Sequence, residues 1–359
     1  MDIKGKHKHR IFKFTARTLM TISAIALLLS YLSIFCNPAK LWFMTLFGLL
    51  YLPFLVLNLT LLVIAIIRRS KAVWIPAVVL VPSFVIFGWH MQLLGPSQPP
   101  VPEDVKVITY NVGRFRAGSN ADACRDSIFC FIRGQKADIV CLQEVSVDKT
   151  TSVADLFAKS FKGYNVEYYV YTQKSGSYGN VTLSRFPLKD KGKIIFEGSA
   201  NMALYGDYDI HGRTVRVYNC HFQSYNISLA GIGAALKSNA KETVRDTEDK
   251  MKSSLRARPK QVDAVIKDIE SCKLDTFVAG DFNDTPMSYT YWKLSRGRRD
   301  SFKDAGKGFG ATYSMLQPLL RIDYILSPKD VRATSHKIVK LKYSDHYPVV
   351  ATFAMAENK

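Results

Sequence analysis

Apolar residues follow two different patterns along the chain, one before and one after about residue 94. In the first part they form three long stretches, at residues 19–35, 41–67 and 72–94. A helix that crosses a bilayer needs about 20 consecutive, mostly apolar residues. We therefore expect a membrane domain over residues 1–94 with three transmembrane helices, kinked at Pro53, Pro76 and Pro82. A cleaved leader would explain the first stretch but not the other two.

Polar residues in and between these stretches indicate how the membrane domain is built. Asn58 is expected to hydrogen-bond between two helices, and His90 to lie at the membrane surface. The tail before residue 19 and the turn at 68–71 are rich in Lys and Arg, which favours the cytoplasmic side for both. Three crossings then place everything after residue 94 outside the cytoplasm. We expect an integral protein of the inner or plasma membrane, with a periplasmic or extracellular domain.

After residue 104 the apolar residues fall into short runs that are typical of strands. The segment 95–104 before them is rich in Pro, which predicts a stiff, extended linker. Helical patterns occur at 122–133, 153–160 and 259–270, and strands are predicted at 105–110, 138–143, 166–171, 180–184, 193–196, 203–210, 214–220, 276–280, 322–326 and 348–353. Some strands are consecutive and others alternate with helices, so residues 105–359 are predicted to form an α/β sandwich with mixed sheets.

Polar residues stand at the ends of these predicted strands. Each by itself is typical of a turn, but strand ends that meet at one rim would bring the side chains together. Several carboxylates, two amides and two imidazoles at one rim suit a hard divalent cation and acid–base chemistry. The residues are Asn111, Glu144, His221, Asp281, Asn283, Asp323, Asp345 and His346.

The same residues stand in short motifs, in the order Tyr-Asn-Val, Leu-Gln-Glu, His-Phe-Gln, Gly-Asp-Phe-Asn-Asp, Arg-Ile-Asp-Tyr-Ile and Ser-Asp-His-Tyr-Pro-Val. From about residue 105 to 353 this order resembles the endonuclease/exonuclease/phosphatase superfamily. That superfamily includes deoxyribonuclease-type enzymes, abasic-site nucleases, neutral sphingomyelinases and inositol polyphosphate phosphatases. The resemblance implies a four-layer α/β sandwich with the site at one end of two packed sheets. Because abasic-site nucleases have Tyr in place of His221, the sequence looks closer to the deoxyribonuclease and sphingomyelinase branches.

The resemblance also implies a metal site. Glu144 corresponds to the principal Mg²⁺ ligand of the family, with Asn111 and Asp345 nearby. Oxygen ligands without a thiolate set suit Mg²⁺, or Mn²⁺ in its place. The six cysteines contain no CxxC pair, which argues against a zinc site.

The remaining residues correspond to the family's catalytic groups. Asp281 and Asn283 resemble the residues that orient the attacking water and the phosphate, and His346 and His221 resemble the histidine pair. In this assignment His346 assists the water and His221 protonates the leaving oxygen. Asp323 would orient one of the two imidazoles, and the sequence leaves open which one.

The net charge limits the class of substrate but does not identify it. The formal net charge of +19 favours an anionic partner. Three functions stay open: a nuclease for external nucleic acid, a phosphodiesterase for a phospholipid or lipid head group, and a binding module without activity. The insertion at 224–255 beside His221 would suit a lid or a lipid contact, and a flexible charged insertion is the plainer interpretation.

Overall fold

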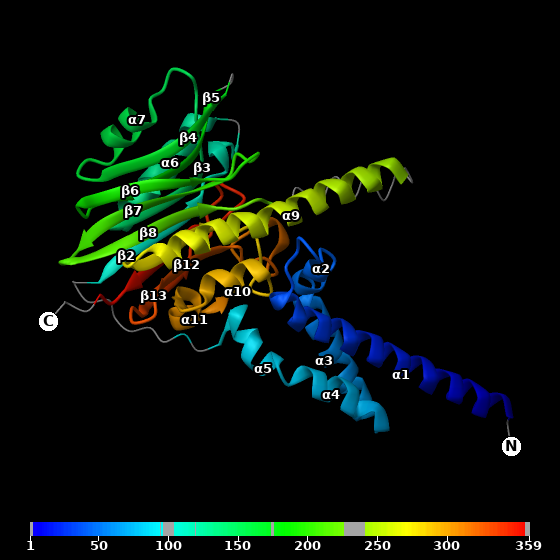
Figure 1. Cartoon of the computed structure of the whole chain (residues 1–359). Coiled ribbons are helices and arrows are strands. Elements are labelled where there is room, and N and C mark those ends of the chain that lie inside the picture. Colours follow the sequence, from blue (N-terminus) through cyan, green and yellow to red (C-terminus); the bar gives the residue numbers. More distant parts are fainter. Residues whose placement is uncertain are drawn as a thin grey trace.

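Figure 1 shows the computed structural model of the chain, in which residues 3–93, 95, 104–118, 120–173, 176–225 and 241–355 are described. A domain with two sheets follows a group of N-terminal helices. The predicted linker at 95–104, apart from its two end residues, lies outside the described residues. So does the apolar run at 229–236 in the 224–255 insertion.

Two six-stranded sheets form the centre of the domain. Their strand orders are β10-β12-β9-β8-β7-β6 and β13-β14-β2-β3-β5-β4. Neighbouring strands are antiparallel except for β2 with β3 and β8 with β9, which confirms the mixed sheets. The strands are β2 (Val105–Asn111), β3 (Ile139–Val147), β4 (Asn165–Gln173), β5 (Gly176–Ser184), β6 (Leu188–Ile195), β7 (Met202–Ile210), β8 (Arg213–His221), β9 (Asp275–Asp281), β10 (Arg298–Asp300), β12 (Asp323–Pro328), β13 (Ala333–Ile338) and β14 (Val349–Phe353).

Helices cover the outer face of each sheet, which gives four layers. The inner faces of the two sheets meet in one apolar cluster that contains Val107 and Val217. Helices α6 (Ala121–Gln135) and α7 (Val153–Ser160) pack on the sheet that holds β2. Helices α9 (Lys241–Ser271) and α10 (Tyr289–Ser295) pack on the sheet that holds β9, and α11 (Ser301–Ala305) lies beside β13 (Figure 1). The order helix, sheet, sheet, helix agrees with the expected sandwich.

The predicted strands each lie in an observed strand, within a few residues at the ends. The two-residue connection between β7 and β8 is a hairpin turn, in which His211 and Gly212 have φ values of 53° and 82°. Two positive φ values match the right-handed twist of paired strands. The strand β13 was missed because its alternation is weak: polar residues dominate it, and it lies at a sheet edge.

Helix α9 corrects the prediction for residues 259–270. Pro259 was expected to begin the helix, but it lies inside a helix that already starts at Lys241. A proline in a helix interior removes one backbone hydrogen bond. Tertiary contacts beside it hold the helix, because the guanidinium of Arg258 donates through Nε to the carbonyl of Gln223 at 2.6 Å.

The N-terminal helices do not support three separate spans. They are α1 (Ile3–Leu32), α2 (Met44–Leu49), α3 (Tyr51–Ile67), α4 (Trp74–Leu80) and α5 (Ser83–Ile86). Among the described residues, only Thr15–Phe35 is by itself long and apolar enough to cross a membrane. The pair Lys71–Leu80 and Ser83–Trp89 passes only as one span bent by 41°, and Tyr51–Ile67 is shorter at 17 residues.

Backbone breaks explain this difference from the hydropathy pattern. The stretch 41–67 divides at Leu50, whose φ of −93° and ψ of 15° are not helical. Pro53 and Pro76 fall in the first turn of α3 and of α4, where a missing N–H removes no helical bond. Pro82 separates α4 from α5, so the expected kink occurs only there.

Buried hydrogen bonds hold the N-terminal helices together. Asn58 donates to the hydroxyl of Ser23 at 2.8 Å, which confirms the predicted bond between helices. At the break beside Pro82, the Tyr31 hydroxyl donates to the carbonyl of Val79 at 2.9 Å. His90 differs from its prediction, since it is buried and its ring lies 4.9 Å from that of Tyr51.

Candidate functional site

The pairing of the strands brings the predicted residues to one rim. Strands β8 and β9 are parallel and end together, with His221 opposite Asp281. Strand β12 is antiparallel to β9 and begins with Asp323, which is also opposite Asp281. In the second sheet, β2 ends with Asn111, beside β3.

One carboxylate oxygen lies at the centre of the site. Asp281 is fully buried, and its Oδ2 accepts hydrogen bonds from the amide of Asn111 at 2.9 Å and of Asn283 at 3.1 Å. The Nε2 atoms of His346 and His221 lie 3.7 and 3.8 Å from the same oxygen. The backbone N–H of Asn283 donates to Oδ1 at 2.8 Å. Both carboxylate oxygens therefore face hydrogen-bond donors.

The backbone on both sides of Asp281 is shaped for this position. Gly280 has a φ of 141°, and a Cβ at this residue would overlap the carbonyl of Cys220 on the neighbouring strand. Asn283 has a positive φ of 52°, and its Nδ2 also donates to the carbonyl of Phe222 at 2.9 Å. Asparagine tolerates this conformation better than most residues. The Gly-Asp-Phe-Asn motif thus sets the backbone as well as the side chains.

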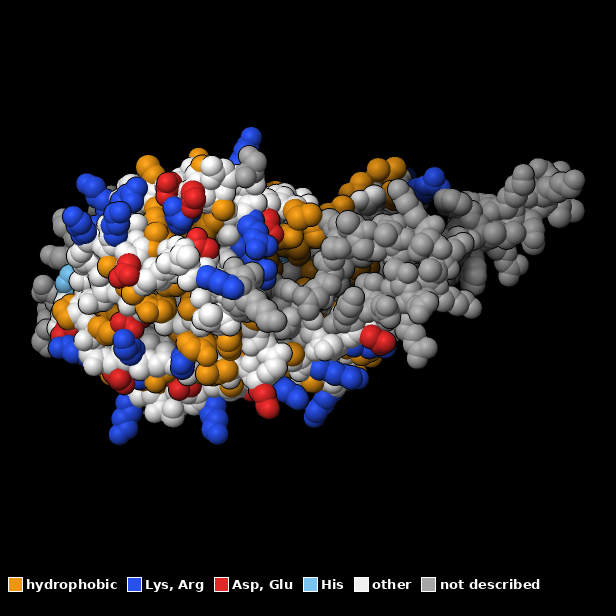
Figure 2. Space-filling view, turned by 90° about the horizontal axis from the view of Figure 1, so that it is seen from above, with side chains coloured by type: hydrophobic (Ala, Val, Ile, Leu, Met, Phe, Trp, Pro, Cys, Tyr) orange, Lys and Arg blue, Asp and Glu red, His pale blue; other side chains and the backbone are white. Residues whose placement is uncertain are grey.

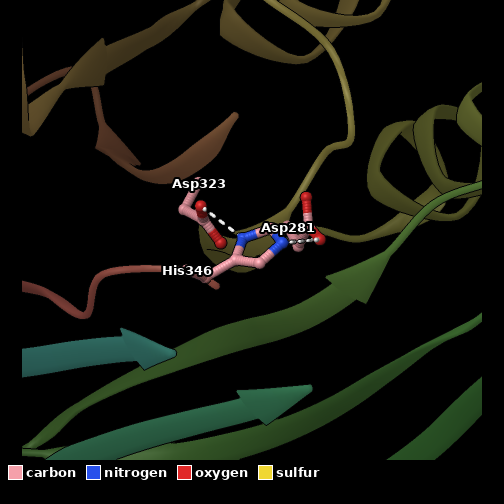
Figure 3. Close-up of side chains that lie close together, drawn as sticks. All are labelled: Asp281, Asp323 and His346. Carbon is pink, nitrogen blue, oxygen red and sulfur yellow. Dashed lines mark hydrogen bonds and ion pairs between the residues drawn. The ribbon is translucent and has the colours of Figure 1, made fainter. Parts of the chain in front are cut away.

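His346 lies between two carboxylates (Figure 3). Its Nδ1 is 3.0 Å from Oδ2 of Asp323, and its Nε2 faces Asp281 on the opposite side. Among the described residues, these three form the one group of acidic and histidine side chains close enough to share a cation, with ligand atoms within 4.8 Å of one another. Asp323 therefore orients His346, which answers the question that the sequence left open.

Electrostatics differ between the two histidines. Burial lowers the pKa of His346, but Asp323 and Asp281 outweigh it and raise the pKa to about 10. Burial lowers the pKa of His221, against the opposing effect of Glu144. Burial also raises the pKa of Asp281, to about 7, although the charge of His346 acts against it. At neutral pH His346 therefore keeps its proton, whereas His221 is neutral.

Glu144 comes from β3, in the opposite sheet from Asp281 and Asp323. It occupies an irregularity in β3, where the pairing with β5 shifts, and has a positive φ of 55°. Its Oε1 is 3.3 Å from Nδ2 of Asn111 and 3.7 Å from Nε2 of His221. The side chain is 26% exposed, so it is only partly covered by its neighbours.

The predicted metal ligands occupy different environments. Asn111 uses Nδ2 toward Glu144 and Asp281, and its Oδ1 accepts from the N–H of Gly113 at 3.1 Å. Asp345 is exposed, and its carboxylate accepts a hydrogen bond from Ser344 at 3.3 Å. Of the three, Glu144 is the one whose carboxylate lies near both Asn111 and His221 while its side chain stays partly exposed.

These donors fit a hard divalent cation better at Glu144 than at His346. A cation needs an imidazole nitrogen with a free lone pair, and both nitrogens of His346 face carboxylates. Glu144 and Asp345 offer carboxylate oxygens, which Mg²⁺ and Mn²⁺ prefer. Glu144 would hold the ion, and Asn111 would orient Glu144 through its amide.

The structure adds site residues that sequence reasoning missed. Arg114 follows β2, lies with Nε 3.6 Å from Oε2 of Glu144 and stacks 4.6 Å above the ring of Tyr178. Tyr313 pairs with His346 in an isolated bridge, with ring centres 5.2 Å apart. Asn180 is buried in β5, where its Nδ2 donates to the carbonyl of Asn219 at 3.3 Å and its Oδ1 has no hydrogen-bond partner within the part of the chain that the structure describes. A polar amide inside an apolar strand was the available signal for Asn180, whereas Arg114 and Tyr313 had none.

Comparison with known families agrees with this geometry. Residues 108–346 match the model of the endonuclease/exonuclease/phosphatase family. The chain belongs to this family. Residues 10–89 separately match a domain of unknown function, DUF8431. A comparison with curated proteins found no match.

Solved structures share the fold of the domain. An endonuclease/exonuclease/phosphatase from Bacteroides vulgatus is 17% identical, with a TM-score of 0.53 over 70% of this chain and 99% of that one. The catalytic domain of human Nocturnin, with bound sulfate, is 16% identical, with a TM-score of 0.52 over 71% and 95%. Humanized D. rerio TDP2 is 17% identical, with a TM-score of 0.52 over 70% and 100%. At these identities the likeness shows the fold alone.

The contact between Asp323 and His346 predicts that the two residues act as one unit. Asp323→Asn should lower kcat for a soluble aryl phosphodiester by about 10²–10⁴-fold, because the imidazole loses its charged partner. The double variant Asp323→Asn, His346→Ala should be no slower than His346→Ala alone. Steady-state kinetics of the full chain in detergent test this, with unfolding temperatures as the control for folding. Losses that multiply in the double variant would contradict the prediction.

Proposed function

We propose that this chain is a metal-dependent phosphodiester hydrolase with nuclease-like activity. The observation that carries the proposal is the set of donors around Asp281, where amides and imidazoles from both sheets surround one buried carboxylate oxygen. Such a set can hold a water and orient a phosphate at one point. A divalent ion held by Glu144 would supply neutralisation of the charge that develops on the phosphate oxygens.

The contacts favour a specific division of work among the residues. Both nitrogens of His346 face carboxylates, so this imidazole donates hydrogen bonds rather than accepting a proton. Asp281 is then the proton acceptor for the attacking water, and His346 positions the water or the phosphate. His221 borders both Glu144 and Asp281 and, as a neutral imidazole, would donate a hydrogen bond to the leaving oxygen without transferring its proton. Arg114, beside Glu144, would supply a positive partner for a phosphate oxygen.

Metal dependence is the first test of this proposal. Excess chelator should abolish hydrolysis of an aryl phosphodiester by the full chain, and Mg²⁺ or Mn²⁺ should restore it. Glu144→Gln should lower kcat by about 10²-fold and raise the Mg²⁺ concentration needed for half activity, because one ligand oxygen becomes an amide nitrogen. Glu270→Gln, at an exposed residue of α9, is the matched control and should change neither quantity. Full activity in chelator would overturn the proposal.

The leaving group tests the role of His221. A departing alkoxide is much more basic than an aryl oxide, so it depends more on a hydrogen bond donated to it. His221→Ala should therefore lose about 10²–10⁴-fold with an alkyl phosphodiester and much less with a nitrophenyl one. His346→Ala should stay slow with both substrates, since it acts on the other side of the phosphate. Equal recovery of both variants with the aryl ester would show that the roles are wrongly assigned.

Two classes of phosphodiester are candidate substrates: nucleic acids and phospholipids. In Figure 2 the Lys and Arg side chains of one face are spread among acidic and apolar ones, so this face offers no single basic path for a nucleic acid. The net charge of +19 still favours a polyanion. A phospholipid or lipid head group is the alternative, which the apolar helices in the same chain favour. An inactive binding module is disfavoured, because the polar groups of the site stand within contact of one another.

The N-terminal helices are proposed to lie in a membrane. Their outward side chains are apolar, with Ile22 60%, Trp74 72% and Phe84 89% exposed. Soluble proteins seldom expose so much apolar surface in one place. The start of α1 and the turn between α3 and α4 lie at the end of these helices that is remote from the sheets (Figure 1). That turn holds Arg68 and Arg69, so the remote end is proposed to face the cytoplasm and the catalytic domain the outside. In this proposal the short helix Tyr51–Ile67 makes the return crossing between the two longer apolar segments.

Reporter fusions test this orientation. A reporter that matures only in an oxidising external compartment should give signal when fused after Lys359 and none when inserted after Arg69. A cytoplasmic reporter should give the reverse pattern. Cytoplasmic signal at both positions would overturn the proposed orientation and would mean that the helices return the chain to the same side.

A further inference from the structure

Two segments of the catalytic domain receive direct contacts from the N-terminal helices. One is the stretch 284–288 between Asn283 and α10, and the other is the stretch 308–313 that leads to Tyr313. Figure 1 shows α10 directly above the near end of α5, and α2 beside the same part of the domain. Both segments continue into residues of the catalytic site.

The first contact reaches the side of Asp281. The Ser33 hydroxyl, at the end of α1, lies 2.8 Å from the carbonyl of Met287 in a buried hydrogen bond. Met287 is 1% exposed and packs in one cluster with Leu27, Tyr31 and Tyr51. A Cβ on Gly48 would collide with the same Met287 carbonyl and with the Ser33 hydroxyl. Glycine is therefore required there for the helices to approach the domain.

The stretch between Asn283 and Met287 is fixed on its other side as well. Arg258 of α9 lies 2.9 Å from the Asp284 carboxylate, and both side chains are almost fully buried. The Tyr324 hydroxyl donates to the Asp284 carbonyl at 2.8 Å. The contacts at Met287 and at Asp284 thus hold the two ends of one four-residue segment, and this segment directly follows Asn283, whose amide donates to Asp281.

The second contact reaches the side of His346. After α5, β1 (Met91–Gln92) pairs with β11 (Gly308–Phe309), and the N–H of Gly310 donates to the carbonyl of His90 at 2.8 Å. Two residues on, the Thr312 hydroxyl accepts from the N–H of Asp323 at 3.1 Å. Its neighbour Tyr313 packs on the ring of His346. The same stretch thus supports both members of the Asp323 and His346 pair.

We propose that the N-terminal helices are a positioning part of the catalytic site, with Ser33 and Gly48 as positioning residues, and not only an anchor. Through Met287 they fix Asn283 and Asp281, and through Gly310 and Thr312 they fix Asp323 and His346. The kinetic part of this inference rests on the proposed hydrolase function. Its structural part does not.

The test uses the full chain in lipid nanodiscs and a small soluble aryl phosphodiester, so that membrane access does not limit the substrate. Gly48→Val and Ser33→Ala are the test variants. Ser30→Ala is a matched control, because its buried hydroxyl donates to Leu27 within the same helix at 2.6 Å. Gly134→Ala is the second control, since a Cβ there meets open space.

The expected result is a fall in kcat of about 10- to 100-fold for Gly48→Val, with KM changed less than about threefold, because misplaced catalytic groups slow the chemical step. Ser33→Ala should show a smaller fall, and the controls none. Hydrogen exchange should accelerate at residues 282–288 and 310–313 in the test variants, and not in α6 or β4.

Each other outcome overturns the inference in a distinct way. Unchanged exchange in 282–288 and 310–313 would show that the contacts support nothing. Faster hydrogen exchange at these residues with unchanged kcat would show that the helices stabilise the two segments without affecting catalysis. Acceleration throughout the domain would show a role in overall stability only. Absent hydrolysis in the unmodified chain would count against the proposed function, while the exchange data would still decide the structural part.

Discussion

The buried carboxylate of Asp281 is the constraint on which the rest of the site depends. A carboxylate removed from water is tolerated only when donors replace the lost hydration. Here the donors come from both sheets, because Asn111 ends β2 in one and His221 ends β8 in the other. The hydrogen bond between Asn111 and Asp281 therefore connects the sheets at the rim. Any arrangement of the sheets that broke it would leave a buried charge without a partner.

The same principle fixes the sheets away from the rim. Gln143 donates from Nε2 to Oδ1 of Asn219 at 2.8 Å, and Asn219 donates from Nδ2 to the carbonyls of Val181 and Leu142 at 3.0 and 3.2 Å. These amides are fully buried between the sheets. Leaving any one of these groups unsatisfied would cost about 1–3 kcal/mol, so sliding of one sheet over the other is strongly opposed. Because Gln143 precedes Glu144, this bond also sets where Glu144 stands.

The sequence predicted those parts of the site that depend on a local pattern of residues, and missed those that depend on how distant segments meet. Alternation of apolar residues located the strands, and their ends placed Asp281 and His221 at one rim. The partner of Asp323 could not be found in this way, because the choice between the histidines depends on how the loop before β14 returns to β12. Arg114 was missed for a similar reason, since an arginine in a short turn carries no pattern. The hydropathy of 41–67 indicated one span, but hydropathy does not report the backbone break at Leu50.

Composition and packing divide this chain at different places. Composition changes near residue 94, where the apolar helices end and the α/β pattern begins. The packing shows no boundary at residue 94, because His90 and β1 already pair with the α/β domain and Ser33 bonds to Met287. A domain cut at residue 105 would lose these partners and expose Met287 together with the apolar side chains of α10. The packed unit that contains the candidate site therefore includes the near ends of the N-terminal helices, and its boundary follows the buried contacts rather than the hydropathy.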